Sequence, residues 1–442
     1  MGGVNRTNAV AEGANLLALR SHNTALVLDL LRTAGEEGIS RLELAERTGL
    51  TPQAVSKITA RLRAEGLAAD AGRRASTGGK PRTVLRLVPG AGHAVGAHLD
   101  RDELRTVLVD LTGAVVAERR APLDLGAGAD AVVAAVAREV TGALAEAGTG
   151  AGAEADTGAV ADAATGAGAV AGTVRAGSVL GVGVALPGPL DHTRGVLHRV
   201  TGFPEWDGFP LRDALAARLG MPVVVDKDTN AAALGLAVGE EVGRAVGSFA
   251  YLHLGTGLGA GLVIGGTVHR GARTGAGEFG HQVIQLDGPP CTCGGRGCIE
   301  ALCLAAVSGG DLDEAARVLG AGAANLVGLL DIDLVLLGGR TVATAPDAFV
   351  RGVAGVLADR ARREGAETVP VRVAPGGERG VAEGAAQLLL APLFGRTPTP
   401  GAAAAAEAGA APTPGAAAAA ASGAGSAPAP GAAAAPGPPL RP

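Results

Sequence analysis

The chain has 442 residues, enough for two or three domains, and a formal net charge of −5. Hydrophobic residues make up 47% and aromatic residues only 2%, so we expect a core built from Val, Leu and Ala. There is no apolar run of about twenty residues and no signal-like start, so we expect neither a membrane span nor secretion. We therefore expect a cytoplasmic protein whose nucleic-acid contacts, if it makes any, depend on local charge.

The segment 15–88 predicts three helices followed by a hairpin. Asn23 can cap the first helix, and Ser40 with Glu43 forms a capping box that opens the second. Thr51 can cap the third helix after a tight glycine turn. A helix, a short turn and a second helix form the helix-turn-helix layout, whose second helix enters the major groove of DNA.

Positive charge is concentrated at the end of this segment. Residues 57–86 hold eight basic and two acidic residues, a local net charge of +6, which is typical of phosphate contact. We expect an outward helix face that includes Thr59, and base-edge contacts from Gln53, Ser56 and Lys57. The predicted DNA-contacting residues are Thr51, Gln53, Ser56, Lys57, Arg61, Arg73, Arg74 and Lys80. The alternative is a three-helix bundle with a solvated basic face.

A second motif gathers metal-ligand side chains. His281, Cys291, Cys293 and Cys298 have the spacing H-x9-C-x-C-x4-C, and three thiolates with one imidazole form a closed shell for Zn²⁺. The alternative is a set of buried free thiols. Cys303, the remaining cysteine, fits the core of a helix.

Strands alternate with helices from 179 onward, which predicts an α/β fold. The glycine-rich turn that contains Gly255, Thr256, Gly257 and Gly259 joins two strands and could approach an anion. Asp228 follows a buried strand and could accept a proton or a hydrogen bond from a sugar hydroxyl, or simply cap a helix.

Two stretches are almost free of large apolar residues. They lie at about 147–178 and from about 396 to 442, and both are rich in Gly and Ala. Such segments cannot offset their ordering entropy, so we expect disorder.

Several motifs together resemble the ROK family of repressors, open reading frames and kinases. Over residues 15–395, apart from the insert near 147–178, the shared motifs run in the expected order. They are ISRLELAERTGLTPQAVSKI, TGGKPRTVLRL, VALPGPLD, the D-x-N-AAALG stretch, LGTGLGAG, AGEFGH before the cysteine loop, CIE after it, and LVLLGG.

The resemblance implies a winged helix-turn-helix domain (1–90) followed by a two-lobed, actin-like, sugar-kinase-like sensor domain (91–395). It matches Asp228 to the general base of the kinases. It matches Glu278, His281 and Glu300 to positions that hold sugar hydroxyls.

Three departures separate this chain from the kinases. The phosphate motif D-x-G-G-T is replaced by a stretch with Asp100 and Asp102, acids that would repel nucleotide phosphates. Lys227 stands where an asparagine usually precedes the base, and Gly202 replaces a sugar-contacting asparagine. The residues Gly255, Thr256, Gly257 and Gly259 are then a vestigial phosphate loop.

The sequence therefore predicts a transcriptional repressor of carbohydrate-related genes that lacks kinase activity. Its expected partners are a double-stranded DNA operator, a sugar or sugar-derivative effector, and further copies of itself in a dimer or tetramer. An ATP-dependent sugar kinase with Asp228 as base is the alternative, and a zinc scaffold without a ligand is a third possibility.

Overall fold

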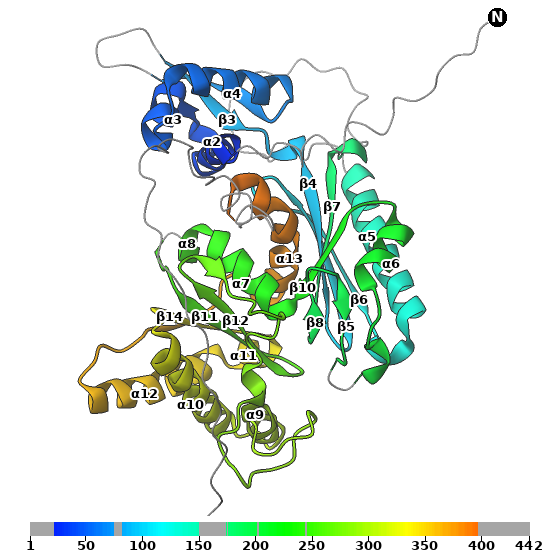
Figure 1. Cartoon of the computed structure of the whole chain (residues 1–442), viewed down its shortest axis with the longest axis vertical. Coiled ribbons are helices and arrows are strands. Elements are labelled where there is room, and N and C mark those ends of the chain that lie inside the picture. The colour runs from blue at the N-terminus through cyan, green and yellow to red at the C-terminus, as the bar shows by residue number, and fades with distance from the viewer. Residues whose placement is uncertain are drawn as a thin grey trace, which may run out of the picture. The chain divides into compact units, whose positions relative to one another are not determined.

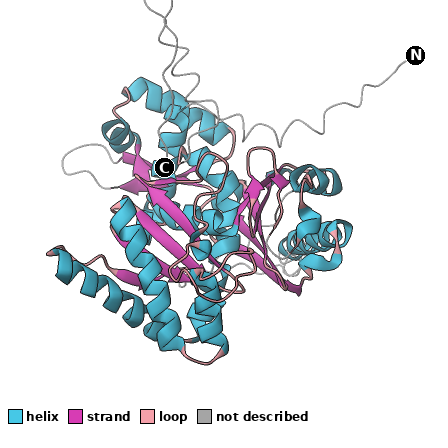
Figure 2. Ribbon diagram, turned by 60° about the horizontal axis from the view of Figure 1, so that its bottom comes forward, coloured by secondary structure: helices cyan, strands magenta, loops and turns pink. Residues whose placement is uncertain are grey.

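The computed structural model describes residues 22–74, 82–149, 174, 176–200, 203–243 and 245–396 (Figures 1 and 2). The chain divides into two compact units, Met1–Thr397 and Pro398–Pro442, and every described residue belongs to the first. The predicted tail lies outside the described residues, apart from Arg396. Gly202 lies outside them as well.

The insert predicted at 147–178 is too wide at both ends. Helix α5 (Ala129–Thr149) includes its first three residues. At the other end, Ser178 is buried with its Oγ 3.0 Å from Nδ1 of His93. Residues 151–173 lie outside the described part of the chain.

The N-terminal segment folds as three helices and a small sheet. They are α2 (His22–Thr33), α3 (Arg41–Thr48) and α4 (Pro52–Ala64), with β1 (Ile39–Ser40), β2 (Ala68–Arg74) and β3 (Arg82–Leu87) in the antiparallel order β1-β3-β2. The Ser40 capping box and the Thr51 cap are confirmed. The prediction for Asn23 is wrong, because the chain is already helical at His22.

Two mixed sheets follow, and they share one topology. The first has the order β10-β7-β4-β5-β6, built from β4 (His93–Leu99), β5 (Glu103–Asp110), β6 (Val115–Pro122), β7 (Val179–Leu186) and β10 (Val223–Lys227). The second has the order β13-β12-β11-β14-β15, built from β11 (Phe249–Leu254), β12 (Leu258–Ile264), β13 (Thr267–Val268), β14 (Leu334–Gly338) and β15 (Val371–Val373). In each, an antiparallel meander of three strands is extended by two parallel strands.

Helices cover the sheets on both sides (Figure 1). Helices α5 and α6 (Leu211–Leu219) pack on the first sheet, while α9 (Ile299–Ser308), α10 (Leu312–Leu330) and α12 (Pro346–Glu364) cover the second. Helix α7 (Asp228–Val238) packs on β12, α13 (Gly380–Leu390) packs on β4 and β7, and the two helices contact each other. The short elements are α8 (Glu240–Gly243), α11 (Arg340–Thr344), β8 (Leu190–Asp191) and β9 (Val196–Leu197).

Glycines allow α7 and α13 to approach closely. A Cβ atom on Gly384 would lie 2.0 Å from the carbonyl oxygen of Ala231, and one on Gly235 would lie 3.0 Å from Cα of Gly384. The two sheets are therefore joined through a helix crossing with no room for a larger side chain.

The C-terminal end of α13 contacts the N-terminal helix α2. Phe394, just beyond α13, belongs to the same buried cluster as Val27 and Leu31 of α2. Nη2 of Arg396 lies 2.7 Å from Oδ2 of Asp29, and Arg32 lies over the Phe394 ring at 5.2 Å. The N-terminal three-helix segment thus shares a core with the first sheet's helix layer.

We expect Gly384→Ala to destabilise the protein by about 1–3 kcal/mol, because the added methyl group clashes with the α7 backbone. Gly355→Ala is the matched control, since its helical position in α12 has no atom within 4 Å of the new Cβ. The control should be neutral or stabilising by about 0.5–1 kcal/mol. Urea unfolding of both variants measures the difference, and equal midpoints would contradict the crossing described above.

Candidate functional site

The exposed face of α4 carries most of the predicted base-contacting residues. Gln53, Ser56 and Lys57 are exposed, while Val55 and Leu62 are fully buried. The prediction for Thr59 is wrong, because this residue is buried and its hydroxyl donates to the carbonyl of Val55 at 2.8 Å. A threonine can satisfy its hydroxyl within its own helix, which is why an inward position does not require an apolar residue.

The other predicted DNA-contacting residues have mixed positions. Thr51 and Arg61 are exposed but already make local contacts, since Thr51 caps α4 and Arg61 donates to Oγ1 of Thr24 at 2.6 Å. Arg73 and Arg74 belong to β2, the first strand of the wing, but their side chains and Lys80 lie outside the described residues.

The predicted metal ligands meet in space. Ligand atoms of His281, Cys291, Cys293 and Cys298 all lie within 4.8 Å of one another. Sγ of Cys291 is 3.7 Å from Nδ1 of His281, and the sulfurs of Cys293 and Cys298 are also 3.7 Å apart. This cluster could hold a metal ion. Cys303, by contrast, is buried in α9 with its Sγ 3.5 Å from the Ala315 carbonyl oxygen.

Glycine conformation shapes the cysteine loop. Gly294 and Gly297 have φ values of +89° and +66°, which other residues rarely adopt. A Cβ on Gly297 would lie 1.6 Å from the carbonyl oxygen of Gln285. The loop ends at Cys298, which directly precedes α9, so the metal-ligand cluster fixes the start of the helix that carries Glu300.

Asp228, Glu278, His281 and Glu300 line one cavity of about 80 Å³. The same cavity is lined by Thr256, Gly257 and Gly259, so the structure brings the predicted sugar-binding residues and the glycine turn together. Oε2 of Glu300 accepts a hydrogen bond from the backbone N–H of Leu258 at 2.8 Å. We call this space, with its lining residues, the ligand cleft.

Asp228 is the first residue of α7 and is not its N-cap. The N-cap position is Lys227, and Oδ1 of Asp228 accepts from the N–H of Thr229 at 2.6 Å. Helix capping therefore does not explain this carboxylate. Its position at the end of β10 directs it to the cleft.

A buried polar cluster that the sequence analysis missed supports this turn. Asp226 is 1% exposed and accepts from Nε of Arg270 at 2.7 Å, from the N–H of Lys227 at 2.8 Å and from Nδ2 of Asn230 at 2.9 Å. The available signal was the acidic residue that follows the three valines of the strand VVVDK. Because Asp226 bonds both sides of Asp228, it fixes the backbone there.

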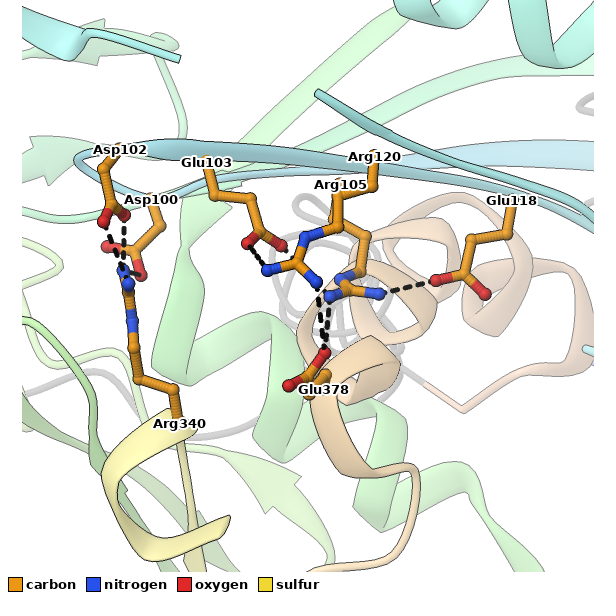
Figure 3. A network of polar contacts seen from close by, with 8 residues as sticks. All are labelled: Asp100, Asp102, Glu103, Arg105, Glu118, Arg120, Arg340 and Glu378. Atoms are coloured by element: carbon orange, nitrogen blue, oxygen red, sulfur yellow. Dashed lines mark hydrogen bonds and ion pairs between the residues drawn. The ribbon is translucent and has the colours of Figure 1, made fainter. Parts of the chain in front are cut away.

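The acidic turn that replaces the phosphate motif is ion-paired. Arg340, the first residue of α11, lies 2.7 Å from Oδ2 of Asp100 and also pairs with Asp102 (Figure 3). Oγ1 of Thr256 donates to Oδ1 of Asp100 at 2.8 Å. These acids were predicted from the sequence, but their partner Arg340, which directly follows the LVLLGG strand, was not. The bridge connects the first sheet to the second.

The pKa of Asp100 reflects these contacts. Burial alone would raise it, but the neighbouring His98 ring, the Arg101 N–H, Arg340 and Thr256 together lower the pKa of Asp100 to about 2. Asp100 is therefore ionised and paired at neutral pH.

A larger cavity, of about 530 Å³, lies beside this bridge. Arg105 is buried on its wall and pairs with Glu118 at 2.6 Å and Glu378 at 2.7 Å, as Figure 3 shows. The lining contains four arginines and six acidic residues. The cavity wall thus carries a net negative charge, which disfavours a polyanionic ligand.

Comparisons with known proteins agree with this geometry. Residues 167–309 match the ROK family and residues 26–68 match a winged helix-turn-helix DNA-binding family. The kanosamine kinase of Amycolatopsis mediterranei is 33% identical over 227 residues, which cover 44% of this chain and 71% of that protein. The chain belongs to the ROK family.

A xylose repressor of Caldicellulosiruptor bescii is 27% identical over 286 residues, covering 65% of this chain and 64% of that protein. The chain spans 59–64% of the length of this repressor and two similar ones. The crystal structure of a ROK family transcriptional regulator, described as a homolog of the E. coli MLC protein, has a TM-score of 0.64 at 20% identity. The match covers 85% of this chain and 98% of that one. The predicted fold, a winged helix-turn-helix followed by the ROK sugar-kinase-like fold, is confirmed.

Within the described residues, no helix combines the length and the apolar character that crossing a membrane requires.

We expect Arg340→Ala to raise the pKa of Asp100 from about 2 towards its ordinary value. A lowered carboxyl pKa stabilises the folded state above pH 4 and loses that effect as the pH falls from about 4 to 2. The variant should therefore be less stable than wild type at neutral pH, and the difference should shrink in acid. Unfolding curves between pH 2 and 7 measure this, and a constant difference across that range would contradict the assignment.

Proposed function

We propose that this chain is a DNA-binding, sugar-responsive transcriptional repressor of carbohydrate-related genes that does not phosphorylate its ligand. The observation that carries the proposal is a combination of two features. The recognition helix is exposed, and the turn that replaces the phosphate motif beside the ligand cleft is ion-paired with Arg340. The matches to xylose repressors support the same reading.

The DNA-binding part of the proposal follows from exposure and charge. Gln53, Ser56 and Lys57 are exposed on α4, and within the described part of the chain their side chains make no hydrogen bond or ion pair, so they are available to base edges. The wing strands β2 and β3 carry Arg73, Arg74 and Arg82 next to this helix, and Lys80 lies between them in sequence. Arginine and lysine at a wing position the protein on phosphates. A pair of such heads in a dimer or tetramer would read a pseudo-palindromic operator.

The effector part follows from the cleft. Asp228 and Glu300 offer carboxylate oxygens and His281 an imidazole, which suits the hydroxyl groups of a neutral sugar or sugar derivative. D-xylose is the first probe to test, since relatives are named as xylose repressors.

Absence of kinase activity follows from the charges around Arg340. In a kinase, this region must accept a polyanion, but here Asp100 and Asp102 occupy it and already hold the nearby guanidinium group. A nucleotide would have to displace two carboxylates and then lie against them. Asp228 is retained, so it serves as a hydrogen-bond acceptor for the ligand.

A route from the cleft to the DNA-binding segment runs through the packed helices. Asp228 begins α7, α7 crosses α13 at Gly384, and the chain after α13 pairs Arg396 with Asp29 of α2. A ligand that shifts α7 changes the position of α2 through these contacts. Only a difference in ligand affinity between the two arrangements is needed for the switch.

The metal-ligand cluster is proposed to bind structural Zn²⁺ through His281, Cys291, Cys293 and Cys298. Three thiolates and one imidazole match the closed tetrahedral shell of such sites, with no position left for water. When bound, the ion holds the loop closed. Glu278 precedes this loop in the sequence and Glu300 follows it, so the loop helps to position both acids in the cleft.

Gel shifts with the chain's own upstream region test the DNA and sugar parts together. We expect salt-sensitive binding that D-xylose or a related sugar weakens. Lys57→Ala should reduce DNA affinity by about 1–3 kcal/mol. Arg218→Ala, at an exposed position on α6, should not.

Asp228→Asn should keep DNA binding and lose the sugar response. Sugar-dependent ADP release that Asp228→Asn abolishes would favour the kinase alternative instead.

Metal analysis tests the zinc proposal. We expect about one zinc ion per chain, lost on chelation together with a fall in melting temperature. Cys298→Ser should lose the metal, whereas Cys303→Ser should keep it because Cys303 lies outside the cluster. Equal metal content in the two variants would rule the site out.

A further inference from the structure

A buried lysine occupies the ligand cleft. Lys227 ends β10, is 3% exposed, and lines the same cavity as Asp228 and Glu300. Its Nζ donates to Oε1 of Glu278 at 2.8 Å and to the carbonyl oxygen of Ala276 at 2.8 Å. The side chain is also confined by Gly188, where a Cβ would lie 2.8 Å from Cδ of Lys227.

These contacts engage Oε1 of Glu278, one of the two carboxylate oxygens that a ligand could use. An ammonium–carboxylate hydrogen bond is roughly twice as strong as one between neutral groups, so a neutral hydroxyl competes poorly for the same oxygen. The remaining space, about 80 Å³, is well below the roughly 300–1,000 Å³ of typical small-molecule sites. The lysine therefore fills part of the cleft and engages one of its acceptor oxygens.

We infer that Lys227 is an internal ligand of the cleft and determines which effectors are admitted. This inference rests on the proposed sugar site. An effector reaches Oε1 of Glu278 by inserting a group between this oxygen and the ammonium. A hydroxyl can do so, since it donates to Glu278 and accepts from Lys227. A protonated amine cannot accept a hydrogen bond, and it adds a second positive charge beside Lys227.

The effector class that follows is a neutral polyhydroxyl sugar with a free hydroxyl at this position, and not a sugar with a protonated amine there. Lys227 also weakens binding, because its bond to Glu278 must open first. Replacing it with a shorter, uncharged residue should enlarge the cleft and free the carboxylate.

Amine labelling tests the bridge without any knowledge of the effector. The sequence contains three lysines, Lys57, Lys80 and Lys227, so acetylation can be followed at each by mass spectrometry. Exposed Lys57 is the internal reference. We expect Lys227 to react at least about tenfold more slowly than Lys57. Glu278→Gln should accelerate Lys227 labelling. Glu205→Gln, at an exposed site, should leave it unchanged. No acceleration in Glu278→Gln overturns the bridge.

Calorimetry with D-xylose, D-glucose and D-glucosamine tests the consequence. Lys227→Asn and Lys227→Met should bind a neutral sugar about tenfold more tightly than wild type. They should also lose discrimination against D-glucosamine. Melting curves verify that both variants fold.

The outcomes separate the inference from the proposed function. If both folded variants bind a neutral sugar no more tightly than wild type, the role of Lys227 is overturned while the sugar sensor stands. If labelling behaves as expected but no sugar binds to wild type or variants, the bridge stands and the sugar-sensing function fails.

Discussion

The crossing of α7 and α13 is the contact on which the rest of this structure depends. Each helix packs on a different sheet, and the close approach of Gly384 to the Ala231 carbonyl joins the two halves. Helix α7 begins at Asp228, which lines the cleft, and α13 leads to the contacts with α2. A rigid, tightly packed junction transmits displacement, since close-packed interiors have few alternative arrangements. The cleft and the N-terminal helices therefore both adjoin one tightly packed junction.

Two cations, the exposed Arg340 and the buried Lys227, neutralise carboxylates between the sheets. Arg340 pairs with Asp100 and Asp102 on one side of the cleft, and Lys227 pairs with Glu278 on the other. Both pairs include a carboxylate that lines the smaller cavity, Asp100 in one and Glu278 in the other. Unpaired buried charges are costly, and Asp100, whose side chain is the most buried of these acids, is held by a protein cation. In this chain the protein supplies the cation, and the pairs tie together elements far apart in sequence.

The metal-ligand cluster and the cleft are adjacent and share one residue, His281. The loop that carries Cys291, Cys293 and Cys298 lies between Glu278 and Glu300, and His281 contributes to both sites. The positive φ values of Gly294 and Gly297 allow the loop to fold back on itself. Order in the loop therefore determines where the two acids lie.

The sequence by itself determined the local features of this protein. The Ser40 capping box, the Thr51 cap and the spacing of the cysteine loop involve neighbouring residues, so their interactions follow from the order of residues alone. The tertiary structure alone decided the pairing of Arg340 with Asp100, 240 positions away, and that of Lys227 with Glu278, 51 positions away. It also revealed that the two sheets repeat one topology. Long-range ion pairs and strand order leave no periodic pattern in a sequence, because they depend on how distant segments meet in space.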